Sequence, residues 1–246
     1  MPNALSGRIA LVTGASRGIG HATALKLAAE GAHVVAVART VGGLEELDDA
    51  IRASGGTATL VPLDLKDFPG IDRLGGALHE RYGRLDVLVG NAAILGPVSP
   101  LGHVEPKAWD DVIAVNVTAN WRLIRSMDPL LRQAEAGRAV FLTSGAASNA
   151  RAYRGPYSLS KAALDVLVRT YAAETASTNV RANLFNPGST RTRMRATLMP
   201  GEDPATLPTA DEVAAQIVEL CLPSFQETGR LYHYPTRKLL TFQPPA

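Results

Sequence analysis

Seven short apolar runs alternate with helical patterns along this chain, and the alternation limits its possible folds more than any other feature. The runs cover residues 8–13, 33–38, 58–63, 85–90, 138–144, 180–187 and 229–234. The helical patterns between and after them lie at about 18–30, 41–54, 67–82, 106–135, 155–177 and 210–221. Strands that are apolar on both faces belong in a parallel sheet covered by helices on each side. The pattern therefore predicts a doubly wound α/β fold, with a mostly parallel sheet of about seven strands and helices on both faces.

The chain shows no repeat, linker or low-complexity tract, so we expect residues 1–246 to form one domain. The stretch at about 189–209 is rich in Thr, Arg and Pro and is expected to be a lid inserted in that domain. The formal net charge of +2 is too balanced for a nucleic-acid-binding surface.

Cysteine and histidine usage narrows the chemistry further. A single cysteine, Cys221, excludes an intrachain disulfide framework, and five scattered histidines predict no metal site. No run approaches the roughly 18 apolar residues of a membrane span, and the N-terminus lacks the pattern of a signal peptide. We therefore expect a soluble, cytoplasmic protein that makes no membrane contact.

A glycine-rich turn, "TGASRGIG", follows the first predicted strand and places Gly14, Gly18 and Gly20 where a helix opens. Such a turn lets the backbone approach a pyrophosphate, and the helix N-terminus offers free N–H groups to its charge. The alternative is a tight turn that needs only positive φ angles. The strand before it and the helix after it favour the cofactor interpretation.

Tyr157 and Lys161 lie four residues apart in "GPYSLSKAALDVLV", so they share one face of a predicted helix. A nearby ammonium favours the phenolate and is expected to lower the pKa of the phenol. Such a phenol can give a proton to a carbonyl oxygen or take one back. The spacing alone is common, however, and packing with a solvated lysine explains it equally well.

The order of these motifs resembles the short-chain dehydrogenase/reductase family of the Tyr-x-x-x-Lys type, including 3-oxoacyl-thioester reductases. The resemblance covers about residues 7–235 and implies a Rossmann-like NAD(P)-binding fold. It also implies a catalytic set in which Ser144 orients the substrate carbonyl, Lys161 binds the ribose and Asn116 holds a relay water. Asn120 is an alternative to Asn116 for holding the water, and Ser148 is an alternative to Ser144 for orienting the carbonyl. Asn116 also has a purely structural alternative, a hydrogen bond to backbone.

The second predicted strand ends in Ala38-Arg39, where an NAD-selective site usually carries a carboxylate. A guanidinium can bind a ribose 2′-phosphate through two parallel hydrogen bonds, and Arg17 in the glycine turn could flank it. We therefore expect NADP(H) rather than NAD(H). The alternative is two solvated arginines at the edge of the sheet.

The resemblance implies further cofactor contacts. Asp64 and Leu65 would contact the adenine, although Asp64 could equally be a helix N-cap. In "GNAA" the residues Asn91 and Ala92 match the family pattern Asn-Asn-Ala-Gly, whereas Gly90 and Ala93 depart from it. The complete expected cofactor set is Gly14, Ser16, Arg17, Gly18, Ile19, Gly20, Arg39, Asp64, Leu65, Asn91, Ala92, Tyr157, Lys161, Pro187, Gly188, Thr190 and Thr192.

The implied function is the NADPH-dependent reduction of a ketone or 3-oxoacyl carbonyl to an alcohol, or the reverse reaction. An NADP-binding regulatory or sensor protein without turnover is the alternative. The expected partners are a small-molecule substrate and a second copy of the chain, because family members form homodimers or homotetramers, here through 106–135 and 155–177. An anionic substrate, or solubility and lid pairing alone, could explain the arginines near the site, Arg151, Arg154, Arg191, Arg193 and Arg195.

Overall fold

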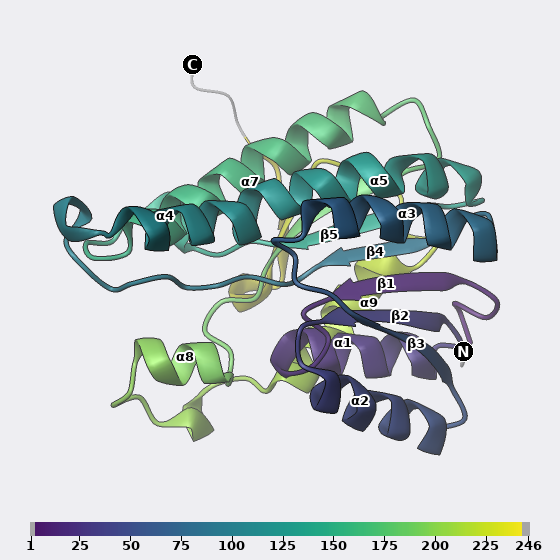
Figure 1. Cartoon of the computed structure of the whole chain (residues 1–246), viewed down its shortest axis with the longest axis horizontal. Coiled ribbons are helices and arrows are strands. Elements are labelled where there is room, and N and C mark those ends of the chain that lie inside the picture. The colour runs from purple at the N-terminus through teal and green to yellow at the C-terminus, as the bar shows by residue number, and fades with distance from the viewer. Residues whose placement is uncertain (1–2, 243–246) are drawn as a thin grey trace.

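A single twisted sheet of eight strands runs through the computed structural model, which describes residues 3–242 (Figure 1). The strand order is β3-β2-β1-β4-β5-β6-β7-β8, and β8 alone is antiparallel to its neighbour. The strands are β1 Ile9–Thr13, β2 His33–Ala38, β3 Thr57–Pro62, β4 Val87–Gly90, β5 Arg138–Leu142, β6 Arg181–Asn186, β7 Leu231–His233 and β8 Lys238–Leu240. The order reverses between β1 and β4, and open α/β sheets bind their ligands at such a switch point.

Helices cover both faces of the sheet (Figure 1). Helices α1 (Gly18–Ala29), α2 (Val41–Ala53) and α9 (Ala210–Cys221) pack on one face, and α3 (Phe68–Tyr82), α5 (Ala119–Gln133) and α7 (Gly155–Glu174) pack on the other. The shorter helices are α4 Pro106–Ile113, α6 Ala146–Asn149 and α8 Arg193–Leu198.

The apolar runs build two core layers because successive side chains of a strand point to opposite faces. In β1, Ala10 and Val12 join the layer under α1, whereas Leu11 joins the layer under α5. Leu11 pairs with Val35 of β2 and Leu88 of β4, and all three are fully buried. Each such side chain contributes about 1.5–3 kcal/mol.

The predicted Rossmann-like α/β fold is confirmed, with one strand more than expected. The missed strand, β8, has three exposed residues and follows a tight turn at Arg237, whose φ is 55°. The helical region predicted at 106–135 is α4 and α5 joined by a π-helical segment, Ala114–Thr118. Within residues 3–242, every helix is too short or too polar to span a lipid bilayer.

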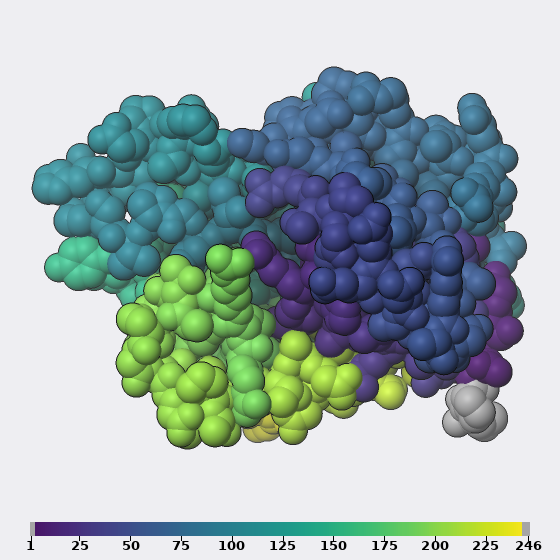
Figure 2. Space-filling model, turned by 60° about the horizontal axis from the view of Figure 1, so that its bottom comes forward, coloured from purple at the N-terminus to yellow at the C-terminus, as the bar shows by residue number. Residues whose placement is uncertain are grey.

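The stretch at 189–209 is more ordered than a simple loop. It contains α8 and a 3-10 turn at Pro204–Thr206. In Figure 2 this segment, in green, forms a lobe that lies beside the purple N-terminal part of the chain. The methyl group of Thr192 lies 3.6 Å from where a Cβ of Gly18 would be, so the segment meets the glycine turn directly.

Candidate active site

The glycine turn between β1 and α1 is packed too tightly for side chains. A Cβ on Gly20 would lie 2.4 Å from both the Gly14 oxygen and the Asn91 Nδ2. Gly14 and Gly18 also have positive φ angles of 67° and 60°. Positive φ is therefore only part of the reason for these glycines, because Gly20 is needed for close approach.

Asn91, directly after β4, holds this turn in place. Its Nδ2 donates to the Thr13 oxygen at 2.8 Å and to the Gly14 oxygen at 3.3 Å. The backbone N–H groups of Asn91 and Ala92 both donate to the Thr13 hydroxyl, at 3.0 and 3.1 Å. Asn91 therefore lies at the expected place beside the glycine turn, with its amide nitrogen engaged in shaping it.

The turn presents a donor set that fits phosphate groups. Helix α1 begins after Arg17, whose side chain does not cap it, so its N-terminus is free to attract an anion. Arg17 and Arg39 are exposed, and neither side chain has a hydrogen bond or ion pair within residues 3–242. Ser16 lies against Gly43 at the start of α2, where a Cβ would be 2.9 Å from the Ser16 Cβ. A pyrophosphate and a further phosphate could be held here.

Asp64 follows β3 at the same edge of the sheet, but it does not cap the next helix. Its Oδ1 accepts from Lys66 N at 2.9 Å, and the cap of α3 is Asp67, which accepts from Gly70 N at 3.0 Å. The alternative of Asp64 as an N-cap is therefore wrong. Asp64 is half-buried and the adjacent Leu65 is buried.

Ser144, Tyr157 and Lys161 meet where β5 ends and α7 begins. The side chain of Ser144 lies near that of Tyr157 and opposes the rise in the phenol's pKa that burial causes. Lys161 is buried and donates to the Leu142 oxygen at 2.7 Å, with its Nζ 5.8 Å from the centre of the Tyr157 ring. The rival Ser148 is exposed and donates instead to the Gly145 oxygen at 3.3 Å.

The electrostatics of this cluster differ from the expectation. Burial raises the pKa of Tyr157, and only the Ser144 hydrogen bond and the charge of Arg154 oppose that rise. Burial also lowers the pKa of Lys161 to about 8, with Asp165 opposing. The predicted lowering of the phenol's pKa by Lys161 is therefore wrong here, because the lysine donates to a backbone oxygen and partial burial of the phenol disfavours the phenolate.

Asn116 lies in the π-helical segment and is completely buried. Its Oδ1 accepts from Ile94 N and its Nδ2 donates to the Ile94 oxygen, both at 2.9 Å, and to Ser160 Oγ at 3.0 Å. The Ser160 hydroxyl in turn donates to the backbone carbonyl oxygen of Tyr157 at 2.7 Å. The structural alternative thus holds for this side chain, which ties the first turn of α7 to the loop after β4. Its rival Asn120 donates to the Asn116 oxygen at 2.8 Å.

The segment after β6 is held by hydrogen bonds within its own turn. Gly188 N donates to Asn186 Oδ1 at 3.0 Å, and the buried Thr190 donates to the Pro187 oxygen at 3.2 Å. Thr192 caps α8 by accepting from Arg195 N at 3.2 Å. The expected residues of this segment therefore form one turn that leads from the sheet to the lid.

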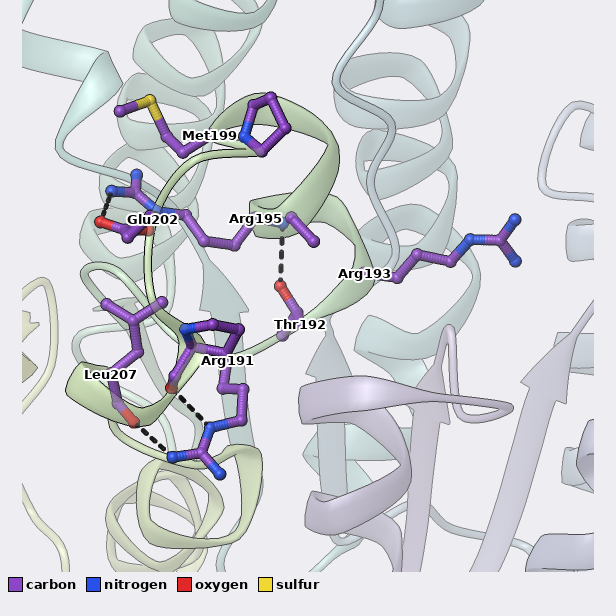
Figure 3. Close-up of a pocket in the computed structure, with 10 residues that line it drawn as sticks. Arg191, Thr192, Arg193, Arg195, Met199, Glu202 and Leu207 are labelled. Atoms are coloured by element: carbon purple, nitrogen blue, oxygen red, sulfur yellow. Dashed lines mark hydrogen bonds and ion pairs between the residues drawn. The ribbon is translucent and has the colours of Figure 1, made fainter.

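A cavity of about 420 Å³ lies within the lid rather than at Tyr157 (Figure 3). Arg195 forms a two-pronged ion pair with Glu202 at 2.5 and 2.6 Å, and Arg191 donates to the Pro204 oxygen at 2.8 Å. Arg193 points away from the cavity (Figure 3). Pairing within the lid, the alternative to binding of an anionic substrate, thus accounts for Arg191 and Arg195.

Arg154 also contacts this segment, with its Nη2 3.9 Å from the sulfur of Met199. Arg151, like Arg193, is exposed. Within residues 3–242, no cluster of three or more His, Cys, Asp or Glu side chains could hold a metal ion.

Two residues of the cluster were missed from the sequence. Thr143, directly before Ser144, donates a hydrogen bond to Asp165, which lies one helical turn after Lys161. The signal available was the Lys161-to-Asp165 spacing of four in a helical pattern. That pattern says nothing of which strand end the carboxylate meets.

Comparison with known proteins identifies the family that the sequence motifs resemble. A family model described as short chain dehydrogenase matches residues 8–203. The uncharacterized oxidoreductase YciK of Escherichia coli is 36% identical over 212 residues, which are 85% of this chain and 84% of that protein. An uncharacterized NAD-dependent oxidoreductase of Mycobacterium tuberculosis is 35% identical over 77% of this chain and 74% of its own length. A short chain dehydrogenase from Shigella flexneri, solved in complex with NADP, has a TM-score of 0.91 and 34% identity, covering 96% of this chain and 100% of that one.

Proposed function

This chain belongs to the short-chain dehydrogenase family, and from that premise we propose that it is an NADP(H)-dependent reductase of a ketone or 3-oxoacyl carbonyl, or the corresponding alcohol dehydrogenase. The family consists of oxidoreductases that use nicotinamide cofactors. One observation carries the finer assignment: Ser144, Tyr157 and Lys161 meet at the carboxyl edge of the sheet that also carries the glycine turn.

The proposed chemistry follows from these side chains. A bound nicotinamide supplies the hydride for the carbonyl carbon. Ser144 donates a hydrogen bond to the carbonyl oxygen, and Tyr157 transfers its phenolic proton to that oxygen. The phenol is protonated at neutral pH, as a proton donor must be, and its raised pKa makes it a weaker acid until the Lys161 ammonium stabilises the phenolate that forms. The Lys161 ammonium is adjacent to that phenolate, and Asn116, through Ser160, fixes the first turn of α7 that carries Tyr157.

The cofactor would lie across the switch point between β1 and β4. Gly14, Ser16, Gly18, Ile19 and Gly20 would hold its pyrophosphate, as the tight turn and the uncapped helix support. Asp64 and Leu65 would contact the adenine, Asn91, Ala92, Tyr157 and Lys161 the ribose of the nicotinamide half, and Pro187, Gly188, Thr190 and Thr192 the carboxamide. The lid at 189–209 would cover the bound substrate.

NADP(H) is proposed over NAD(H) because no described residue pairs with the guanidinium groups of Arg17 and Arg39, and the end of β2 carries no carboxylate. The NADP complex of the Shigella flexneri relative supports this choice, whereas the name of the Mycobacterium tuberculosis relative gives NAD. We also propose a homodimer or homotetramer through α5 and α7, which expose the large apolar side chains of Trp121, Leu159 and Val166.

The test is turnover of a panel of small ketones and 3-oxoacyl thioesters with NADPH, for the wild type and for Tyr157→Phe. The variant lacks only the proton donor, so kcat should fall by about 10²–10⁴-fold. Binding of NADPH, followed by its fluorescence, should stay within a few-fold. A fully active Tyr157→Phe would refute the catalytic assignment. A wild type that binds NADPH but reduces nothing in the panel would favour the regulatory alternative.

A further inference from the structure

Asp165 lies on α7 one helical turn after Lys161, and its carboxylate reaches across to the end of β5. Thr143, buried directly before Ser144, donates its hydroxyl hydrogen to Asp165 Oδ1. Asp165 itself is half-buried, and within residues 3–242 it forms no ion pair with a lysine or arginine within 4.0 Å. A carboxylate at such a position is costly unless its charge or its oxygens are used.

The neighbours of Asp165 limit what its charge can act on. On α7 itself the charged groups that influence it are Lys161 and Arg169. Directly after β5 it meets the uncharged Thr143. Elsewhere on that face of the sheet, the amides of Asn116 and Asn120 are uncharged, and Asp128 of α5 is engaged by Tyr171 and Arg132. Lys161, on the preceding turn and deepest in the site, is the cation that gains most from this charge.

Building on the proposed function, we propose that Asp165 is a positioning residue with two effects. Its carboxylate holds Thr143 and therefore the strand end that carries Ser144, and its negative charge keeps Lys161 protonated beside Tyr157. Neither effect requires Asp165 to touch substrate or cofactor.

The charges of Asp165 and Lys161 depend on each other because the two side chains lie one helical turn apart. Burial raises the pKa of Asp165 to about 6, with the Thr143 hydrogen bond and Lys161 opposing. Burial lowers the pKa of Lys161 to about 8, and the charge of Asp165 opposes that fall. Both groups are therefore charged between about pH 6 and 8. Removal of the Asp165 charge should lower the pKa of Lys161 further, so the ammonium is lost at a lower pH.

The direct test is Asp165→Asn, which keeps an acceptor for Thr143 and removes the charge. The chain has only five lysines, Lys26, Lys66, Lys107, Lys161 and Lys238, so ¹³C-labelled lysine gives few NMR signals. Lys161→Met identifies the signal of interest by its loss. In the cofactor-free protein the Lys161 signal should titrate about one pH unit lower in Asp165→Asn than in the wild type. The high-pH limb of kcat for carbonyl reduction should move in the same direction.

Thr143 supplies the matched control for the hydrogen bond. Thr143→Val keeps the Asp165 carboxylate but removes the donor, and it should lower kcat about tenfold. Thr143→Ser keeps the hydroxyl, and its kcat should remain within about twofold of the wild-type value, because the same hydrogen bond can form. If Asp165→Asn does not fold, Asp165→Glu, which keeps the charge, and the Thr143 pair carry the test. An active Thr143→Val would then overturn the proposal.

Two results would refute the inference while leaving the proposed function intact. One is an Asp165→Asn protein whose Lys161 signal titrates as in the wild type. The other is a loss of activity in Asp165→Asn that is equal at every pH, which a merely structural role would produce. Absence of turnover in the wild type would instead count against the proposed function, and the Lys161 titration would still decide the role of Asp165.

Discussion

Gly90 is the position where the structure makes its sharpest prediction. It ends β4 and pairs with Phe141 of β5, whose ring is completely buried. A Cβ at position 90 would lie 2.3 and 2.7 Å from the Phe141 atoms Cδ1 and Cε1, and 2.9 Å from Asn120 Oδ1. Ordinary contacts begin at about 3.4 Å, so Gly90→Ala must displace the ring by roughly 1 Å.

The magnitude follows from two opposing effects. Overpacking a close-packed core costs about 1–3 kcal/mol. The alanine also reduces the entropy of the unfolded chain, which returns about 0.4–1 kcal/mol. From the middle of both ranges, the net loss in the free energy of unfolding should be about 1.3 kcal/mol, or about 3–5 °C in Tm for a chain of this size.

Urea and thermal unfolding of four proteins would measure this: the wild type, Gly90→Ala, Phe141→Leu and the double variant. The smaller leucine makes room, so the double variant should be more stable than the sum of the single losses by about 0.5 kcal/mol or more. Gly76→Ala is the matched control, because Gly76 lies on the exposed face of α3 and a Cβ there has no atom within 4 Å. Strict additivity, or a Gly90→Ala protein as stable as the wild type, would refute the steric argument.

Two further predictions concern the cofactor and a helix cap. Arg39→Ala should raise the KM for NADPH about tenfold or more and leave the KM for NADH nearly unchanged, because only NADPH carries the 2′-phosphate. Initial rates with both cofactors measure this, and an equal effect on the two KM values would contradict it. Thr209→Ala removes the capping box of α9, in which Glu212 N donates to Thr209 Oγ1 at 3.2 Å, and should cost about 1 kcal/mol in a thermal melt, whereas Thr209→Ser should restore the cap.

The sequence predicted the sheet well because its signals are local. A strand buried on both faces has to be apolar throughout, and the seven predicted runs all became strands. β8 lacked that signal, since it is exposed and held by β7 alone. The π-helical segment was also hidden, because a change in hydrogen bonding by one residue leaves the apolar pattern of the helix intact.

The site residues were predicted as a set, but their interactions were not. Asp64 and Asp67 lie three residues apart and either could cap α3, so the choice depended on where the helix begins. The spacing of Tyr157 and Lys161 correctly predicted that they are close. It could not show that the lysine donates to Leu142, because that carbonyl belongs to a strand 19 residues away.

Gly90 shows most directly why pattern matching stops short of the structure. Considered alone, a glycine where the family has asparagine weakens the match. In the fold, the space that a side chain at 90 would need is filled by Phe141 and by the amide oxygen of Asn120, which comes from α5. The same Asn120 donates through its nitrogen to the Asn116 oxygen. One departure in a strand is thus coupled to a helix residue 30 positions later, and the coupling passes through the π-helical segment that orders Tyr157. A substitution that restores the family residue at position 90 would therefore disturb the site unless Phe141 and Asn120 change with it.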